Sequence, residues 1–171
     1  MNIFKCAVGF VVSLLLMLAG VGFSVGPSAS NNTVEINSSL AKVWDIMTDV
    51  HHQDWRSDLS MYEVIDATAG KQEWLEDYVG GSLLTKSTTT IWHPHQQWET
   101  EFESAPFKGS WNTSFEQIKE GVVKVTLVET ALVKNVVLRG IATVLFLSEG
   151  DFSVVPIYLA DLKKTVEKTV Q

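Results

Sequence analysis

An apolar–polar alternation with a period of two runs from Met61 to Ala131 and constrains the fold more than any other feature of this sequence. Such alternation predicts β-strands with one buried face and one face in water. Turn signals such as Gly80-Gly81 and Glu120-Gly121 separate the segments. Because the connections are too short for crossovers, we expect neighbouring strands to pair antiparallel. The expected strands cover about 61–67, 72–79, 83–92, 96–104, 110–118 and 122–132.

Helical patterns flank this region on both sides. Ahead of it we expect a short strand near 33–37 and an amphipathic helix near 40–47. Behind it lie an apolar segment over 135–147, a polar break over 148–152 and an amphipathic helix over about 153–169. This order predicts an α+β fold, in which a curved antiparallel sheet of about seven strands wraps around a long C-terminal helix.

The N-terminal segment, residues 1–26, contains a run without charge from Cys6 to Val25, and Lys5 precedes the run. A membrane-spanning helix needs about 20 apolar residues, whereas the apolar part of a cleaved secretory signal has about 7–15. The length of the run favours a retained N-terminal membrane helix, with signal cleavage as the alternative. Positive charge at its start predicts that the following domain lies on the extracytoplasmic, periplasmic side, either anchored or released.

The rest of the chain divides into a polar linker, 27–32, and one domain, 33–171. Cys6 is the only cysteine, so the domain can hold no disulfide and no thiolate zinc site. The net charge is −7 and no cluster of Lys and Arg is present, which argues against a nucleic-acid partner. His93 and His95 flank a proline without a third ligand at a nearby spacing, so we expect neither a metal nor another cofactor.

Aromatic residues dominate one face of the expected strands. In the strand at 96–104, for example, Trp98 and Phe102 alternate with glutamates. Such a face forms either an ordinary core or the wall of an apolar pocket. The aromatic candidates for ligand contact are Trp74, Tyr78, Trp98, Phe102, Trp111 and Phe115.

Glu129 falls on the same inner face by the alternation of its strand. An inward carboxylate is costly unless it is hydrogen-bonded or neutralised, so this residue is either a satisfied glutamate near a strand end or a functional group. It is the one catalytic candidate, and it could also hold the polar end of a ligand. Arg139 lies in an apolar segment and needs a partner there, which makes it a candidate neighbour of Glu129 and a candidate ligand contact.

The order of several short segments resembles the START-like, helix-grip superfamily (SRPBCC), in its polyketide cyclase/dehydrase and lipid-transport branch. The resemblance covers about 33–169. The segments that carry it are Val34-Glu35-Ile36-Asn37, 41–49, Trp55-Arg56-Ser57, Gly109-Ser110-Trp111, 125–129 and 159–163.

The resemblance implies a hydrophobic ligand held between the sheet and the C-terminal helix, and no shared catalytic motif. The first functional hypothesis is therefore that the domain binds, and in some settings transports, a lipid-like or other hydrophobic small molecule at a membrane. Two alternatives stay open. One is an enzyme of the polyketide cyclase/dehydratase type that uses an inward carboxylate, and the other is a non-catalytic interaction domain. The oligomeric state is left open.

Overall fold

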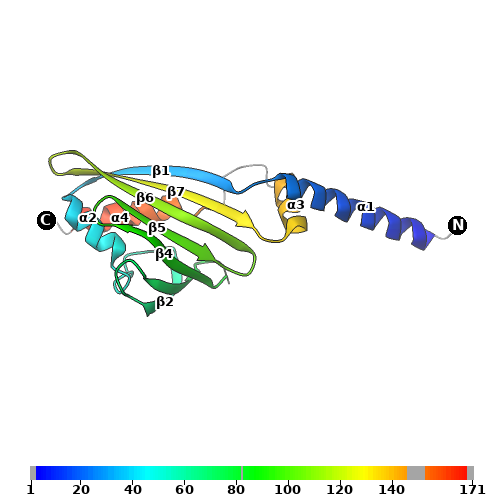
Figure 1. Ribbon diagram of the computed structural model, residues 1–171, viewed down its shortest axis with the longest axis horizontal. Coiled ribbons are helices and arrows are strands. Elements are labelled where there is room, and N and C mark those ends of the chain that lie inside the picture. Colours follow the sequence, from blue (N-terminus) through cyan, green and yellow to red (C-terminus); the bar gives the residue numbers. More distant parts are fainter. Residues whose placement is uncertain (1–2, 82, 146–152, 169–171) are drawn as a thin grey trace.

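The computed structural model describes residues 3–81, 83–145 and 153–168 (Figure 1). Four helices and seven strands follow one another in this part of the chain. Their order is α1 (Ile3–Ser24), β1 (Ser28–Asn37), α2 (Leu40–Thr48), β2 (Leu59–Asp66), β3 (Glu73–Tyr78), β4 (Thr85–His93), β5 (Gln97–Glu103), β6 (Phe107–Lys119), β7 (Val122–Val133), α3 (Val136–Leu145) and α4 (Val155–Lys168).

The strands form one antiparallel sheet in the order β1-β7-β6-β5-β4-β3-β2. From β2 to β7, each strand pairs with the next one along the chain through a short connection. β1, the first strand, pairs instead with β7, the last. The sheet curves around α4, and α2 lies beside that helix (Figure 1). The predicted α+β class and the arrangement of sheet and C-terminal helix are therefore confirmed.

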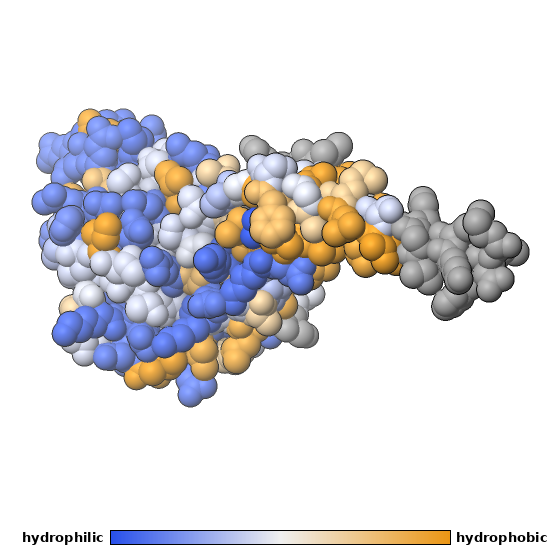
Figure 2. All heavy atoms as spheres, turned by 45° about the vertical axis from the view of Figure 1, so that its right-hand side comes forward, coloured by the Kyte–Doolittle hydropathy of each residue, from blue (hydrophilic) through white to orange (hydrophobic). Residues whose placement is uncertain are grey.

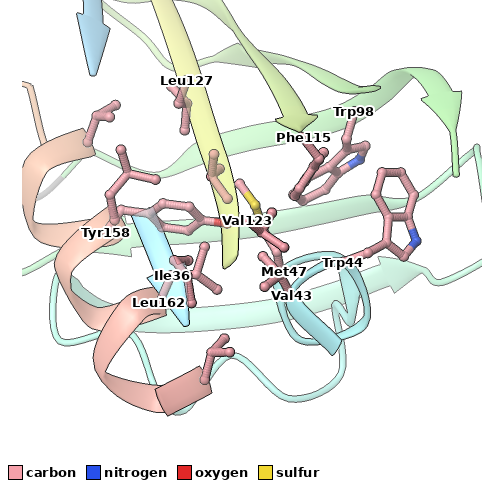
Figure 3. Close-up of a cluster of buried hydrophobic side chains, with 14 of the residues drawn as sticks. Ile36, Val43, Trp44, Met47, Trp98, Phe115, Val123, Leu127, Tyr158 and Leu162 are labelled. Carbon is pink, nitrogen blue, oxygen red and sulfur yellow. The ribbon is translucent and has the colours of Figure 1, made fainter. Parts of the chain in front are cut away.

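The core lies between the inner face of the sheet and the two helices α2 and α4 (Figure 3). Ile36 and Leu127 of the sheet and Leu162 of α4 are fully buried in it. Burial of such a side chain contributes about 1.5–3 kcal/mol, so these contacts hold α4 in the curve of the sheet. The side chain of Ser39 accepts a hydrogen bond from the main-chain N–H of Lys42 (3.4 Å) and so caps the start of α2.

Two segments differ from the expectation at their boundaries. β1 begins at Ser28, so residues 28–32, which were expected to be a linker, pair with residues 127–131 of β7. An edge strand with one neighbour tolerates polar side chains, and its composition therefore resembles that of a linker. The predicted polar break at 148–152 lies outside the described residues.

The N-terminal segment forms α1, a helix of 22 residues. It projects from the end of the sheet and contacts α3 (Figure 1). In the part of the chain that the structure describes, no helix has the length and apolar character required to cross a membrane.

Candidate functional site

The pairing register divides the sheet into two faces. Thr89, Thr100, Trp111 and Glu129 stand opposite one another across β4, β5, β6 and β7 and form one row. This row lies on the inner face, towards the core. Side chains one position along each strand point to the opposite, outer face. Glu129 is therefore an inward residue, as its strand's alternation predicts.

Both carboxylate oxygens of Glu129 accept hydrogen bonds. The indole Nε1 of Trp111 donates to one oxygen (3.0 Å), and the hydroxyl of Ser153 donates to the other (2.5 Å). Ser153 comes just before α4, so the two bonds connect the sheet to the start of the C-terminal helix. The side chains are half-buried, and the carboxylate is therefore held in place without being sealed from a ligand.

A deeper ion cluster is centred on Arg56. Its guanidinium donates to both oxygens of Asp58 (3.2 and 2.6 Å) and to Glu76 (2.8 Å). The second oxygen of Glu76 accepts from the hydroxyls of Tyr78 (2.9 Å) and Ser87 (3.1 Å). The side chains of Arg56, Asp58 and Glu76 are only 2–3% exposed. Buried charges of this kind persist only when they are paired and hydrogen-bonded, as they are here.

The electrostatics of the cluster follow from burial and from its excess of carboxylates. Burial lowers the pKa of Arg56, but the charges of Glu76 and Asp58 outweigh it and raise that pKa well above its ordinary value. Burial, together with the charge of Glu76, raises the pKa of the Tyr78 hydroxyl well above its usual range. Arg56 is therefore a permanent cation, and Tyr78 is a neutral hydrogen-bond donor.

Aromatic rings connect the two groups of polar side chains. The Arg56 guanidinium carbon lies 4.9 Å from the ring centre of Tyr158 and 5.9 Å from that of Trp111. The rings of Trp111 and Tyr158 are in turn 5.3 Å apart. Trp111 thus contacts the buried cation with its ring while its N–H holds Glu129.

The inner face is closed at one end and open at the other. On β6 and β7, Thr113 and Leu127 are buried, whereas Trp111 and Glu129, which stand next to them on the same face, are half-buried. The open end is therefore the one at which β7 ends and α3 begins. We call the half-buried inner side chains Phe102, Trp111, Glu129, Ala131 and Ser153 the open-end site.

The residues expected to contact a ligand fall into three groups. Phe102, Trp111 and Glu129 come together at the open end, where the rings of Phe102 and Trp111 are 6.3 Å apart. Trp74, Trp98 and Phe115 belong to the buried core, and Tyr78 belongs to the ion cluster.

Arg139 does not face Glu129. In the described part of the chain its guanidinium donates to main-chain oxygens, those of Val133 (2.8 Å), Gly22 (3.1 Å) and Val25 (3.4 Å). The expected pairing is therefore wrong. Two of the oxygens that accept from Arg139 lie at the C-terminal end of α1, where the main-chain carbonyl groups receive no hydrogen bond from within the helix.

A hollow of about 870 Å³ lies on the outer face of the sheet rather than between the sheet and α4. It is lined mainly by outer side chains, which form two rows across β4, β5, β6 and β7, and by Pro27 at one side. Most of its side chains are charged or hydroxyl-bearing, so it does not match the apolar pocket that the sequence predicts. The outer side chains that line it are Lys86, Thr88, Glu99, Glu101, Glu103, Lys108, Ser110, Thr130 and Leu132.

The sequence did not identify five residues of these two groups as site residues: Arg56, Asp58, Glu76, Ser153 and Tyr158. A signal existed for Glu76, because it shares one face of its strand with Trp74 and Tyr78, but the two faces of that strand are about equally apolar and the inner one could not be chosen. Arg56 and Asp58 come from the loop before β2, where no periodicity reveals which side chains turn inward. Among the residues that the structure describes, the buried indole N–H groups of Trp55 and Trp74 have no hydrogen-bond acceptor.

Comparisons of sequence find no relative: no protein-family model matches the chain, and no curated protein sequence matches it. Comparisons of structure do find similar proteins. The Zhui aromatase/cyclase from Streptomyces sp. R1128 superposes with a TM-score of 0.69 at 11% identity, over 85% of this chain and 97% of its own.

Norcoclaurine synthase from Thalictrum flavum, in complex with dopamine and hydroxybenzaldehyde, gives a TM-score of 0.65 at 12% identity, over 86% of this chain and 91% of its own. A protein from Thermus thermophilus gives a TM-score of 0.65 at 15% identity, over 84% of this chain and 99% of its own. At these identities the likeness concerns the fold. The chain therefore has a helix-grip fold, which it shares with the Zhui aromatase/cyclase and with norcoclaurine synthase.

Proposed function

We propose that this protein binds a hydrophobic small molecule that carries a hydroxyl group, with the apolar part against Phe102 and Trp111 and the hydroxyl on Glu129. The observation that carries the proposal is the Glu129 carboxylate, which faces inward and is fixed by Trp111 and Ser153 yet remains half-buried. A carboxylate oxygen has lone pairs for more than one donor, so each oxygen can accept a further hydrogen bond from a ligand.

The charge of the site favours neutral hydroxyl-bearing ligands over acids. The ion cluster below it contains two carboxylates and one guanidinium, and Glu129 adds a further carboxylate. A ligand carboxylate would meet this excess of negative charge, whereas a phenol or an alcohol would donate a hydrogen bond to it. The dopamine and hydroxybenzaldehyde of the norcoclaurine synthase complex are hydroxyl-bearing aromatic molecules, which is compatible with this class.

The first test compares two probes of similar shape, 2-naphthol and 2-naphthoate, by calorimetric titration of the full chain. We expect naphthol to bind at least about tenfold more tightly, because a hydrogen bond to a charged acceptor contributes about 1.5–3 kcal/mol. Glu129→Gln should reduce this preference. The matched control is Glu101→Gln, which changes an exposed glutamate on the outer face and should leave both affinities unchanged.

Native mass spectrometry of the gently purified chain gives an independent readout. We expect a bound hydrophobic molecule in the wild type and less of it in Trp111→Ala. An empty protein that also binds neither naphthalene probe would rule out the proposal.

We further propose that the domain lies at the extracytoplasmic face of a membrane and is held there by α1, so that a lipid-like ligand is exchanged with the bilayer. The uncharged run from Cys6 to Val25 and the apolar side chains exposed along α1 support this location. Intact-mass measurement of the mature protein tests it, because loss of α1 by cleavage would contradict a retained anchor.

A second candidate function is acid–base catalysis by Glu129 on the bound molecule, as in a cyclase or dehydratase. The observation that favours it is the pair of hydrogen bonds, from Trp111 and Ser153, that holds the half-buried carboxylate in place. It predicts a pH–rate profile that loses its acidic limb in Glu129→Gln while the fold is retained. Turnover that is unchanged in this variant would exclude the role.

A further inference from the structure

The helices α1 and α3 cross at two glycines with almost no space between their backbones. A Cβ atom on Gly22 would lie 1.8 Å from the carbonyl oxygen of Val136, and one on Gly140 would lie 1.9 Å from that of Leu18. Neither position can accept a side chain unless the helices separate. Crossings at small residues are typical of helices that pack within lipid, where close contact has to replace the hydrophobic effect.

Arg139 adds hydrogen bonds between the two helices at the same crossing. Its guanidinium reaches from α3 to the carbonyl oxygens of Gly22 and Val25, at the C-terminal end of α1, and also to Val133 at the end of β7. A cation is favourable at the C-terminal end of a helix because of the helix dipole. The sheet, α3 and the end of α1 are thereby connected by one side chain, and the crossing fixes the direction in which α1 leaves the domain.

Away from the crossing, the side chains that the structure describes, those of α1 from residue 11 onward and those of α3 up to residue 144, are mainly apolar, and many of them are exposed (Figure 2). Along α1 the exposed residues Val11, Val12, Leu14, Leu15, Leu16 and Met17 point in all directions, since consecutive helical positions differ by about 100°. A groove on a partner protein would cover one side of such a helix, whereas lipid surrounds it. On α3, Leu138 and Val144 are 51% and 52% exposed, and Phe23 near the crossing is 75% exposed.

We propose that α1 and α3 form one lipid-contacting unit, in which α1 inserts into the outer side of a bilayer and α3 lies in the bilayer surface beside the point where α1 enters it. This inference rests on the proposed membrane location of the domain and extends it to a second helix. α3 is too short to cross a bilayer, but its apolar side chains suit a helix that lies in the interface.

This geometry has a consequence for the ligand. α3 directly follows β7, and both helices lie at the end of the sheet where the open-end site is found (Figure 1). With α3 in the interface, the open end faces lipid rather than bulk water. The ligand is then a membrane-resident amphiphile that reaches Glu129 from the bilayer without crossing water.

Spin labels on the full chain in vesicles of phosphatidylcholine and phosphatidylglycerol test the proposal. Each label is introduced singly as cysteine in the Cys6→Ser background, at Leu16 of α1, at Leu138 of α3 and at Ile118 of β6 as the control in water. We expect oxygen, which concentrates in lipid, to relax the labels at Leu16 and Leu138, and a water-soluble nickel chelate to relax the label at Ile118. Gly140→Val separates the helices and should move the Leu138 label into water while the Leu16 label stays in lipid.

The outcomes separate this proposal from the membrane location on which it rests. If nickel reaches Leu138 while oxygen relaxes Leu16, α1 is in the membrane and the role of α3 is overturned. If nickel reaches both, the membrane location fails together with the inference. A label at Leu138 that stays in lipid in Gly140→Val would show that the glycine crossing does not position α3, which would overturn the single-unit proposal.

Discussion

At the scale of single residues, the buried ion cluster gives the clearest energetic expectation. Arg56→Met removes the guanidinium and leaves the carboxylates of Asp58 and Glu76 buried without their cation. Breaking a buried pair in this way costs about 3–5 kcal/mol of unfolding free energy. The control Lys86→Met removes the ion pair with Glu73, in which the lysine side chain is 49% exposed, and should cost at most about 1 kcal/mol.

Urea denaturation monitored by circular dichroism measures both variants. Adding Asp58→Asn and Glu76→Gln to Arg56→Met should recover part of the loss, because the uncompensated charges disappear. If the single variant is as stable as the wild type, the cluster is not a buried structural ion group.

At the scale of elements, Glu167 attaches α4 to the end of β1. Its carboxylate accepts from the main-chain N–H of Asn37 (2.9 Å) and from the Asn37 side-chain amide (2.8 Å). The first of these bonds is the largest factor that lowers the pKa of Glu167. A carboxyl group with a lowered folded-state pKa contributes stability above its unfolded pKa, and the contribution is lost as the pH falls through the folded value.

We therefore expect Glu167→Gln to reduce stability at neutral pH by about 1 kcal/mol and to flatten the loss of stability between neutral and acidic pH. Chemical denaturation at a series of pH values between about 7 and 3 measures this, a range that spans the ordinary glutamate pKa. Glu120→Gln, in the turn between β6 and β7, is the control. A variant with the same pH dependence as the wild type would contradict the proposed link between β1 and α4.

The strands also show how far the sequence predicts the structure. In β5, β6 and β7 the alternation is regular, so the inward positions of Trp111 and Glu129 could be predicted from it. In β3 both faces carry large side chains, and Glu76 is turned inward by its contacts with Arg56 and Ser87, which lie elsewhere in the chain. Partners that are distant in sequence leave no local pattern, and for the same reason the true partners of Arg139 could not be foreseen.

At the scale of the whole molecule, the two ends of the inner face differ in burial, and the proposed binding site lies at the open end. Leu127 and Ala131 lie on the same face of β7, but Leu127 is fully buried at the closed end and Ala131 is half-buried at the open end. We expect Leu127→Ala to lower the unfolding free energy by about 2–5 kcal/mol, because it leaves a cavity in the core, while naphthol binding by the folded protein is retained.

Ala131→Leu should show the converse behaviour. The larger side chain extends into the open-end site beside Phe102 and Trp111, where a ligand would lie, and does not disturb the core. The unfolding free energy should then change by less than about 1 kcal/mol, while the affinity for naphthol falls at least about tenfold, since the probe and the new side chain compete for one volume. Denaturation and calorimetric titration of both variants check the pair. Equal losses of stability and binding in the two would mean that the inner face acts as one undivided core, with its ligand elsewhere.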